Sequence, residues 1–292
     1  MTGETNQSVT CPICGNPLKG RQTYCSPACR KRASRQPLPK EPKARTKELT
    51  DRLGDINAEL KAIGLPPLRK GSDIEPLEFI STGIPEIDEM THGFPRKRIT
   101  EIFGMKGVGK TALMSRIISN GDVKIAYIDT ENALVETPDN VFSTSDYVLE
   151  RVADAVDKLL ERDYDLIVVD SVASLVPRAE AEGDITEMQM GLKARMMGKW
   201  MRRVNEPLAK SNTALVFINQ QRESMEMYGP KKFTPGGHAL PYAASLRLEL
   251  KTTKADRIVK NSEVVGHWVQ VEVEKSRVCK PFQKAKFKLL YE

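Results

Sequence analysis

The chain has 292 residues, of which 40% are hydrophobic and 29% are charged, and its formal net charge is +6. This length holds one core of roughly 220 residues and a small appendage. No apolar run approaches the roughly 18 residues that a membrane helix needs, and the first ten residues lack the apolar segment of a signal peptide. These features exclude membrane and secreted proteins, and we expect a soluble, intracellular protein.

The positive charge is concentrated near the N-terminus. Residues 1–70 contain 14 Lys and Arg against 6 Asp and Glu, a net charge of +8, so 6 − 8 = −2 remains for the rest of the chain. A basic segment of this kind can meet a polyanion such as nucleic acid, or it can be a solvated linker. The charge alone leaves both interpretations open.

Four of the five cysteines lie within residues 11–29, and their spacing is C-x2-C-x10-C-x3-C. Two such pairs can present four thiolates tetrahedrally to Zn²⁺, whereas disulfides are disfavoured in an intracellular chain. We therefore expect a zinc module over residues 1–35, with the ligands Cys11, Cys14, Cys25 and Cys29. The fifth cysteine, Cys279, is expected to be a small, partly buried hydrophobic residue in a strand-like stretch.

A proline-rich basic linker is expected over residues 36–45. The next segment predicts a helix over residues 46–63, because its apolar side chains recur at helical spacing until Gly64 and Pro66 end it. These apolar side chains are Leu49, Leu53, Ile56, Leu60 and Ile63. A narrow apolar stripe needs a groove, which either its own core or a neighbouring subunit supplies. Residues 46–72 are therefore the expected oligomerisation helix and its connection to the core.

Residues 104–111 have the sequence GMKGVGKT, which matches the phosphate-binding pattern G-x-x-x-x-G-K-[ST]. A predicted strand at residues 99–103 precedes it and a predicted helix at residues 111–119 follows, so the helix N-terminus points at the anion. Lys110 brings a cation to the outer phosphates, and the Thr111 hydroxyl can bind Mg²⁺. The expected nucleoside triphosphate site consists of Gly104, Met105, Lys106, Gly107, Val108, Gly109, Lys110, Thr111 and Ala112.

Strands and helices alternate through the rest of the chain. The predicted apolar strands are residues 124–129, 165–170 and 213–220, and the predicted helices are residues 146–163 and 191–211. Nearly continuous apolar strands separated by helices indicate an α/β fold, with a mostly parallel, twisted sheet that is covered on both faces. Further strands within residues 245–291 predict a hairpin-like extension of this sheet.

Three polar residues stand at the ends of predicted strands, where parallel α/β sheets gather functional groups. Asp170 can orient Mg²⁺ and its waters; a terminal Asp could instead cap a helix, but the phosphate-binding loop favours the magnesium role. Glu131 can be the general base for an attacking water. Gln220 can contact the terminal phosphate through its amide.

An ordered series of segments, from about Ser72 to the C-terminus, resembles the bacterial RecA recombinases within the broader RecA-like ATPases. The segments are STGIPEIDE, EIFGMKGVGKT, YIDTENAL, LIVVDSVASLVPRAEAEGD, MGLKARMM, NTALVFINQQR, TPGGHAL and CKPFQKAKFKLLYE. A series in this order is much more specific than any single motif. The resemblance implies a RecA-like P-loop NTPase core over residues 73–292.

The resemblance also implies catalytic roles. Glu131 is implied to be the general base for ATP hydrolysis, with Lys110 on the phosphates, and Gln220 the switch that couples nucleotide state to the following DNA loop. Lys275 and Arg277 match a basic pair that reaches the phosphates of the neighbouring subunit, and their i, i+2 spacing on a strand places both on one face. Without the resemblance, solvated strand charges would be the preferred interpretation of this pair.

Two segments match the DNA-binding loops of the family, the first from about Glu180 to Gly191 and the second from Arg222 to His238. Glycines permit close approach to phosphates, arginines supply charge, and Met190 is a candidate for insertion between bases. Ordinary helix packing is an equally good interpretation of Met196, Met197 and Met201. The implied DNA-binding residues are Met190, Gly191, Arg195, Arg202, Arg203, Arg222, Lys231, Lys232, Gly236, Gly237 and His238.

The implied function is that of an ATP-dependent DNA recombinase with DNA-dependent ATPase activity and Mg²⁺ as cofactor. It forms a helical homo-oligomeric filament on single-stranded DNA, pairs it with homologous double-stranded DNA and exchanges strands. The alternatives are a RadA/Sms-like branch-migration motor, which also joins a four-cysteine module to a RecA-like core, and a single-strand annealing protein. The missing KNRFG-type motif disfavours the first, and the intact Lys110, Glu131, Asp170 and Gln220 disfavour the second.

The expected zinc module would distinguish this chain from typical members of the family, which usually add a C-terminal domain. We expect it to capture duplex DNA, with protein docking as the rival role. The combination suggests a phage-encoded recombinase that acts in the cytoplasm of an infected bacterium.

Overall fold

The computed structural model describes residues 10–11, 26–33, 52–119, 123–134, 139–184, 191–223 and 232–291. The chain divides into two units, Met1–Glu75 and Pro76–Glu292. Within the described ranges, no helix combines the length and the apolar character that crossing a membrane requires.

The first unit contains helices α1 (Pro27–Ala33) and α3 (Leu53–Ala62) and a 3-10 turn, η1 (Gly71–Asp73). The helix predicted over residues 46–63 is present from Leu53 to Ala62, while residues 46–51 lie outside the described part. α3 is followed by Gly64, which has a left-handed φ of 78° and donates its backbone N–H to the Lys61 carbonyl. Cys14 and Cys25 also lie outside the described residues, so the zinc module stays a prediction.

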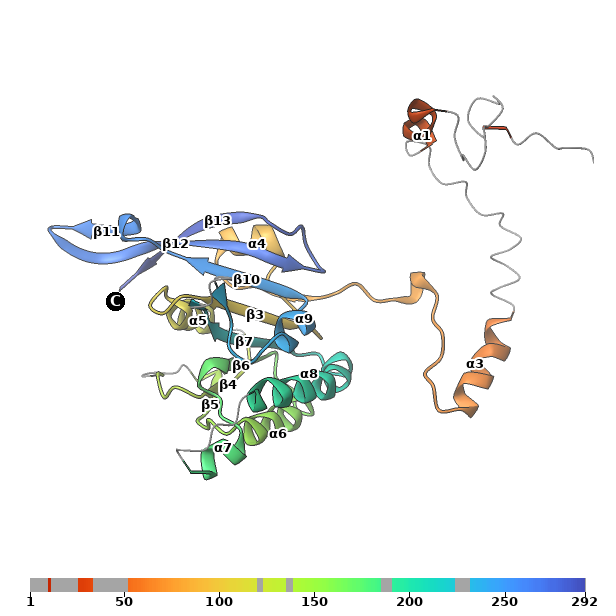
Figure 1. The fold of residues 1–292 in the computed structure, drawn as a ribbon, viewed down its shortest axis with the longest axis horizontal. Coiled ribbons are helices and arrows are strands. Elements are labelled where there is room, and N and C mark those ends of the chain that lie inside the picture. Colours follow the sequence, from red (N-terminus) through yellow and green to blue (C-terminus); the bar gives the residue numbers. More distant parts are fainter. Residues whose placement is uncertain are drawn as a thin grey trace, which may run out of the picture. The chain divides into compact units, whose positions relative to one another are not determined.

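The second unit is built on a nine-stranded sheet in the order β11-β12-β10-β3-β7-β6-β4-β5, with β13 paired to β12. The strands are β3 (Ile99–Gly104), β4 (Ile125–Asp129), β5 (Val141–Thr144), β6 (Leu166–Asp170), β7 (Ala214–Gln220), β10 (Leu246–Lys251), β11 (Arg257–Lys260), β12 (Glu263–Ser276) and β13 (Lys284–Leu290). The strands from β10 to β5 are parallel to one another, and β11, β12 and β13 form an antiparallel extension at one edge (Figure 1). The predicted mostly parallel sheet is confirmed.

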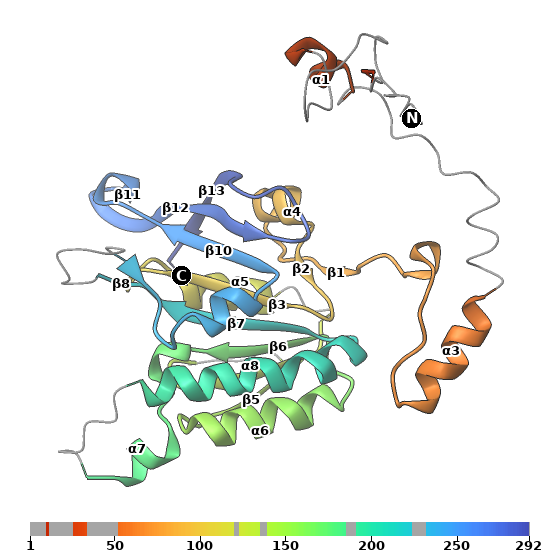
Figure 2. The same cartoon turned by 45° about the vertical axis from the view of Figure 1, so that its right-hand side comes forward.

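Helices cover both faces of this sheet. α6 (Leu149–Leu160) and α8 (Leu192–Lys210) lie side by side on one face (Figure 2), and α4 (Pro85–Thr91) and α5 (Lys110–Ile118) pack on the other. The side chains of β6 alternate between the two apolar clusters: Ile167 and Val169 face α6 and α8, whereas Leu166 and Val168 face α4 and α5. Double coverage therefore explains why the central strands are apolar at nearly every position.

Short elements connect these layers. They are α7 (Arg178–Glu182), α9 (Ala239–Ala243), the 3-10 turns η2 (Val172–Ser174) and η3 (Lys254–Asp256), the strand pair β1 (Phe79–Ile80) and β2 (Phe94–Pro95), and the strand pair β8 (Arg222–Glu223) and β9 (Lys232–Phe233). The expected strand-like setting of Cys279 is wrong, because this residue lies in the connection between β12 and β13. It is half-buried there, as expected, and its Sγ contacts Ser276 Oγ at 3.0 Å.

A buried charged network joins four strands of the sheet. Glu101 of β3 is completely buried and accepts hydrogen bonds from Arg247 Nε of β10 at 2.6 Å and from Asn219 Nδ2 of β7 at 3.0 Å. Arg247 also donates to Glu274 of β12, and its guanidinium lies 4.4 Å from the centre of the Phe103 ring. Since both buried charges have partners, the network fixes β3, β7, β10 and β12 to one another.

Candidate nucleotide and nucleic-acid sites

The loop between β3 and α5 has the backbone conformation of a phosphate cradle. Gly107 and Gly109 have φ values of 78° and 91°, in the left-handed region that favours glycine. A Cβ on Gly104 would lie 2.4 Å from the Leu250 carbonyl oxygen, so only glycine fits where the loop leaves the sheet. α5 begins at Lys110, and its N-terminus follows the loop directly. The predicted strand, loop and helix are therefore all present.

Lys110 lies across this loop. Its Nζ donates to the backbone carbonyls of Gly104 at 3.1 Å and Met105 at 2.9 Å. Burial lowers the pKa of Lys110, and the carboxylates of Asp170 and Glu131 oppose this shift. Because Lys110 is buried, few waters compete with an anion for its ammonium.

Asp170 and Thr111, the predicted magnesium ligands, are in contact. Asp170 Oδ2 accepts hydrogen bonds from Thr111 Oγ1 at 3.2 Å and from the Tyr127 hydroxyl at 2.7 Å. Burial raises the pKa of Asp170, which the hydrogen bond from Tyr127 opposes and the nearby Glu131 carboxylate reinforces. Burial and the Asp170 carboxylate both raise the pKa of Tyr127, which therefore stays a hydrogen-bond donor.

The donor set at this point suits Mg²⁺. A hydroxyl and a carboxylate oxygen are hard ligands, and Mg²⁺ usually takes one or two such protein ligands together with substrate phosphates and water. Among the described residues, no group of three or more His, Cys, Asp or Glu side chains is placed to hold a metal by itself. The pair Thr111 and Asp170 therefore fits an ion that completes its shell from a bound nucleotide.

Glu131 follows β4 at the carboxyl-end edge of the sheet. Its Oε1 accepts hydrogen bonds from Gln220 Nε2 at 2.8 Å, from Ser174 Oγ at 3.1 Å and from Ser171 Oγ. The Glu131 backbone N–H donates to Asp129 Oδ1 at 3.1 Å, which fixes the loop that carries it. The structure thus brings Glu131 and Gln220 together, as their positions after parallel strands led us to expect. It adds Ser171 and Ser174, which sequence reasoning missed.

A hollow of about 270 Å³ adjoins the phosphate-binding loop. It is lined by Gly107, Thr252, Thr253, Lys254, Arg257, His267 and Tyr291. His267 Nδ1 lies 3.0 Å from the Tyr291 hydroxyl oxygen, and His267 Nε2 lies 3.4 Å from the Val108 carbonyl oxygen. Tyr291 is half exposed. Sequence reasoning missed both residues, because only the pairing of β12 with β13 brings them beside the loop.

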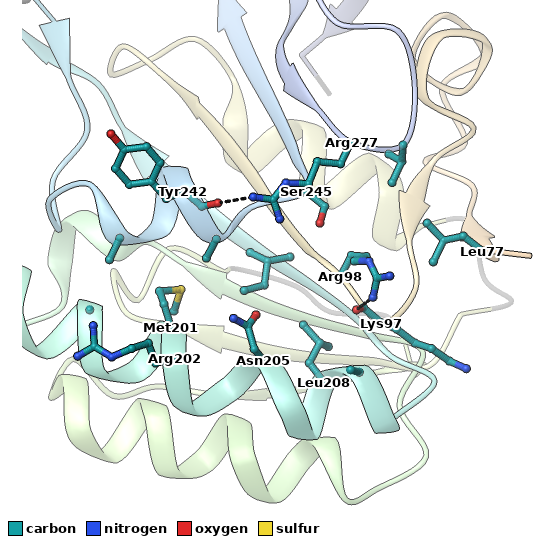
Figure 3. A pocket seen from close by; sticks show the side chains of 16 residues that line it. Leu77, Lys97, Arg98, Met201, Arg202, Asn205, Leu208, Tyr242, Ser245 and Arg277 are labelled. Carbon is teal, nitrogen blue, oxygen red and sulfur yellow. Dashed lines mark hydrogen bonds between the residues drawn. The ribbon is translucent and has the colours of Figure 1, made fainter. Parts of the chain in front are cut away.

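A larger hollow of about 800 Å³ is lined by four basic residues, Lys97, Arg98, Arg202 and Arg277, and by no acidic residue (Figure 3). Arg277 Nη2 donates to the Tyr242 carbonyl at 3.2 Å, and Lys275 Nζ donates to the same carbonyl at 2.9 Å. Lys275 and Arg277, the predicted basic pair, therefore both contact the Tyr242 carbonyl. The sequence analysis did not single out Lys97 and Arg98 as site residues. The available signal was two consecutive basic residues directly before the strand β3.

The predicted DNA-binding arginines of α8 lie in different surroundings. Arg202 lines the basic hollow, and Arg195 is exposed. Arg203 instead pairs with two acids of α6, Asp154 at 3.0 Å and Asp157 at 2.8 Å. Its charge is thus largely compensated within the chain, which makes it the weakest of the three as a phosphate ligand.

The other predicted DNA-binding residues border two gaps in the described structure. Arg222 and Lys232 belong to β8 and β9, His238 precedes α9, and Met190 and Lys231 lie outside the described residues. The glycines Gly191, Gly236 and Gly237 all have positive φ values. A Cβ on Gly237 would lie 2.8 Å from Ala194 Cβ, so the second loop packs closely on the start of α8.

Comparison with known proteins agrees with this geometry. Residues 47–292 match the family described as RecA N-terminal domain. The chain is 37% identical to Protein RecA of Streptomyces venezuelae over 233 residues, which is 74% of this chain and 61% of that protein. It is 35% identical to Protein RecA of Aquifex aeolicus (84% of this chain, 74% of that protein) and 34% identical to Protein RecA of Mycoplasma mycoides (84% and 75%). The chain belongs to the RecA family.

Proposed function

We propose that the protein is an ATP-dependent recombinase, which forms a helical filament on single-stranded DNA and exchanges strands with homologous duplex DNA. The observation that supports this most is the convergence of Glu131, Asp170 and Gln220, from the ends of three neighbouring parallel strands, on the loop of Lys110 and Thr111. The relatives named Protein RecA cover most of the chain and favour a recombinase over a RadA-like motor. The bacterial cytoplasm is the proposed location.

Each residue of the nucleotide site has a proposed task. Lys110 neutralises the outer phosphates in place of the two backbone carbonyls it now contacts. Thr111 and Asp170 hold Mg²⁺, which when bound supplies charge compensation for the phosphate oxygens. Glu131 orients the attacking water and takes its proton, and Gln220 contacts the terminal phosphate from the same side. The nucleotide base is expected beside Gly107, against Tyr291 and His267.

The site is proposed to need a second subunit. Lys275→Ala or Arg277→Ala should lower DNA-stimulated phosphate release by about 10²–10³-fold, because each removes a cation from the phosphates of a neighbouring subunit. Monomer folding should be unchanged. Lys286→Ala, which removes an exposed lysine of β13, is the matched control. Mixing either variant with Glu131→Gln should restore part of the hydrolysis, since intact sites then form between unlike subunits. Mixed filaments that stay inactive would argue against action in trans.

The exposed arginines Arg195, Arg202 and Arg222 and the two candidate loops are proposed to hold single-stranded DNA. The test of the whole proposal is phosphate release from ATP with and without single-stranded DNA. We expect little hydrolysis without DNA and strong stimulation with it. Hydrolysis that DNA leaves unchanged would contradict the DNA-dependent site.

The four-cysteine module is proposed to bind Zn²⁺ through Cys11, Cys14, Cys25 and Cys29 and to capture duplex DNA. Its spacing and the basic residues around it support this. Metal analysis should find one zinc per full chain and none after residues 1–35 are removed. The truncated protein should bind duplex DNA more weakly and with a smaller salt dependence. Its DNA-stimulated ATP hydrolysis should persist. If the full chain and the chain without residues 1–35 bind duplex DNA equally at two salt concentrations, the module does not bind DNA. Docking of a partner protein is then the better interpretation.

A further inference from the structure

Tyr127 of β4 joins the buried core of the sheet to Asp170, one of the two proposed magnesium ligands. Tyr127 is 1% exposed and belongs to the apolar cluster on the side of the sheet that α4 and α5 cover. The hydroxyl at the end of its ring donates to Asp170 Oδ2 at 2.7 Å. Because a buried hydroxyl is costly without a partner, the packing of the ring and the contact with Asp170 support each other.

The register of two parallel strands places this hydroxyl. Tyr127 lies opposite Val168 of β6, and Asp170 follows two residues later on the same face of the sheet. Two residues of a strand span roughly 6.6 Å, a distance that a tyrosine side chain can bridge to its hydroxyl. Thr111, in the first turn of α5, reaches the same carboxylate oxygen from the helix, at 3.2 Å.

Asp170 is the acceptor for Tyr127 among three nearby acids. The carboxylates that act on Tyr127 are those of Asp170, Asp129 and Glu131. Asp129 instead accepts the backbone N–H groups of Glu131 at 3.1 Å and of Leu134 at 2.9 Å. Glu131 accepts three other side-chain donors through its Oε1. Within the described ranges, the phenol proton is therefore directed at Asp170.

The orientation of the Asp170 carboxylate depends on these donors. The last torsion of an aspartate side chain is broad and lacks well-separated staggered minima, so the backbone alone does not fix it. Without Tyr127, the contact from Thr111 at 3.2 Å would be the remaining side-chain hydrogen bond to Oδ2. The Tyr127 contact is shorter, and its ring is immobilised by packing, so it determines how the carboxylate is turned.

We propose that Tyr127 is a positioning residue for the magnesium ligand Asp170, whose carboxylate it holds in the orientation that meets the ion beside Thr111. This inference rests on the proposed magnesium site. A ligand that is oriented in advance loses little freedom when the ion binds, so the affinity for the ion rises. Without the hydroxyl, only a fraction of the molecules would present the carboxylate correctly, and the apparent affinity would fall by that fraction.

The test compares Tyr127→Phe, which removes only the hydroxyl, with Tyr164→Phe, which changes a half-buried tyrosine before the opposite end of β6. The affinity for a fluorescent, non-hydrolysable ATP analogue is measured without divalent ions and with saturating Mg²⁺. By linkage, a change in the gain that Mg²⁺ supplies equals the change in the affinity of the complex for the ion. Tyr127→Phe should lower this gain by about 10–100-fold. Its ion-free affinity should be unchanged, and Tyr164→Phe should match the wild type in both conditions.

Two further readouts separate positioning from a merely structural role. In an Asp170→Ala background, Tyr127→Phe should change the gain no further, because the hydroxyl acts only through Asp170. In ATP hydrolysis, Tyr127→Phe should need at least about tenfold more Mg²⁺ for its half-maximal rate. Its kcat at saturating Mg²⁺ should stay near that of the wild type, since excess ion restores the orientation of the carboxylate.

Thermal unfolding checks that each variant folds. If Tyr127→Phe does not, Tyr127→Met, which fills the space with a flexible apolar side chain, takes its place. A gain from Mg²⁺ that is the same in the wild type and in Tyr127→Phe would overturn the inference alone. An equal loss of affinity with and without the ion would also overturn it, because the hydroxyl would then only support the fold. A wild type to which Mg²⁺ adds no affinity would overturn the proposed magnesium site and the inference with it.

Discussion

Replacing Glu131 with glutamine is expected to lower ATP turnover by about 10²–10⁴-fold, the usual contribution of a positioned general base. The amide can still accept hydrogen bonds from Gln220 and Ser174 but cannot take a proton from water. ATP binding should persist, because Lys110 and Thr111 are untouched. Single-turnover phosphate release gives the rate, and equilibrium binding of a fluorescent ATP analogue gives the affinity.

The matched control is Glu161→Gln, an exposed glutamate after α6 that is remote from the site. It should hydrolyse ATP like the wild type. Wild-type turnover by Glu131→Gln would show that another group activates the water, and the proposed task of this carboxylate would then be wrong.

Glu101→Leu is expected to have the largest effect on stability, lowering the free energy of unfolding by about 3–5 kcal/mol. Glu101 is fully buried, and its removal leaves the buried Arg247 guanidinium with the partly exposed Glu274 as its remaining acid. Asn219 Nδ2 loses one of its two acceptors and keeps the Pro235 carbonyl. Urea unfolding followed by circular dichroism measures the change.

The double variant Glu101→Leu/Arg247→Met should recover much of this loss, because it leaves no buried unpaired charge; Glu274, which loses Arg247, is partly exposed to water. Glu206→Gln, which removes one partner of a fully exposed pair with Lys210, should leave the urea midpoint unchanged. An unaltered midpoint in Glu101→Leu would mean that water reaches the network and that it does not hold the strands together.

The central fold could be predicted because its local signals agree. The strand predicted at residues 99–103 is β3 (Ile99–Gly104), and the strand predicted at 165–170 is β6 (Leu166–Asp170). Continuous apolar runs of this length leave few alternatives. The helix predicted at 146–163 is shorter, Leu149–Leu160, since Asp146 accepts the Val148 N–H in a turn before it begins. Helix ends depend on such local contacts, which periodicity does not reveal.

The site was predictable where it depends on strand ends alone. Glu131, Asp170 and Gln220 follow neighbouring parallel strands, so they meet at one edge whatever the details of packing. Tyr291 and His267 could not be placed in this way, because their positions depend on the antiparallel register of β12 and β13. Contacts between residues far apart in sequence need the tertiary structure.

The sequence also does not reveal which side of a helix is covered by its neighbours. Arg202 and Arg203 are adjacent in sequence, but on a helix they point in directions about 100° apart. Arg202 lines the basic hollow and Arg203 pairs with α6. The sequence marks both as candidate DNA ligands and does not tell which face of α8 is covered by its neighbour.

Joint-molecule formation tests the central claim most directly. A single strand and a homologous duplex are mixed with the protein, Mg²⁺ and ATP, and products are separated by electrophoresis, with a heterologous duplex and the Lys110→Ala variant as controls. The account predicts joint molecules only with the homologous duplex, with ATP and with an intact Lys110. Equal yields without ATP would indicate simple annealing, and ATP hydrolysis without any joint molecules would indicate a motor of another kind; either result would contradict the recombinase assignment.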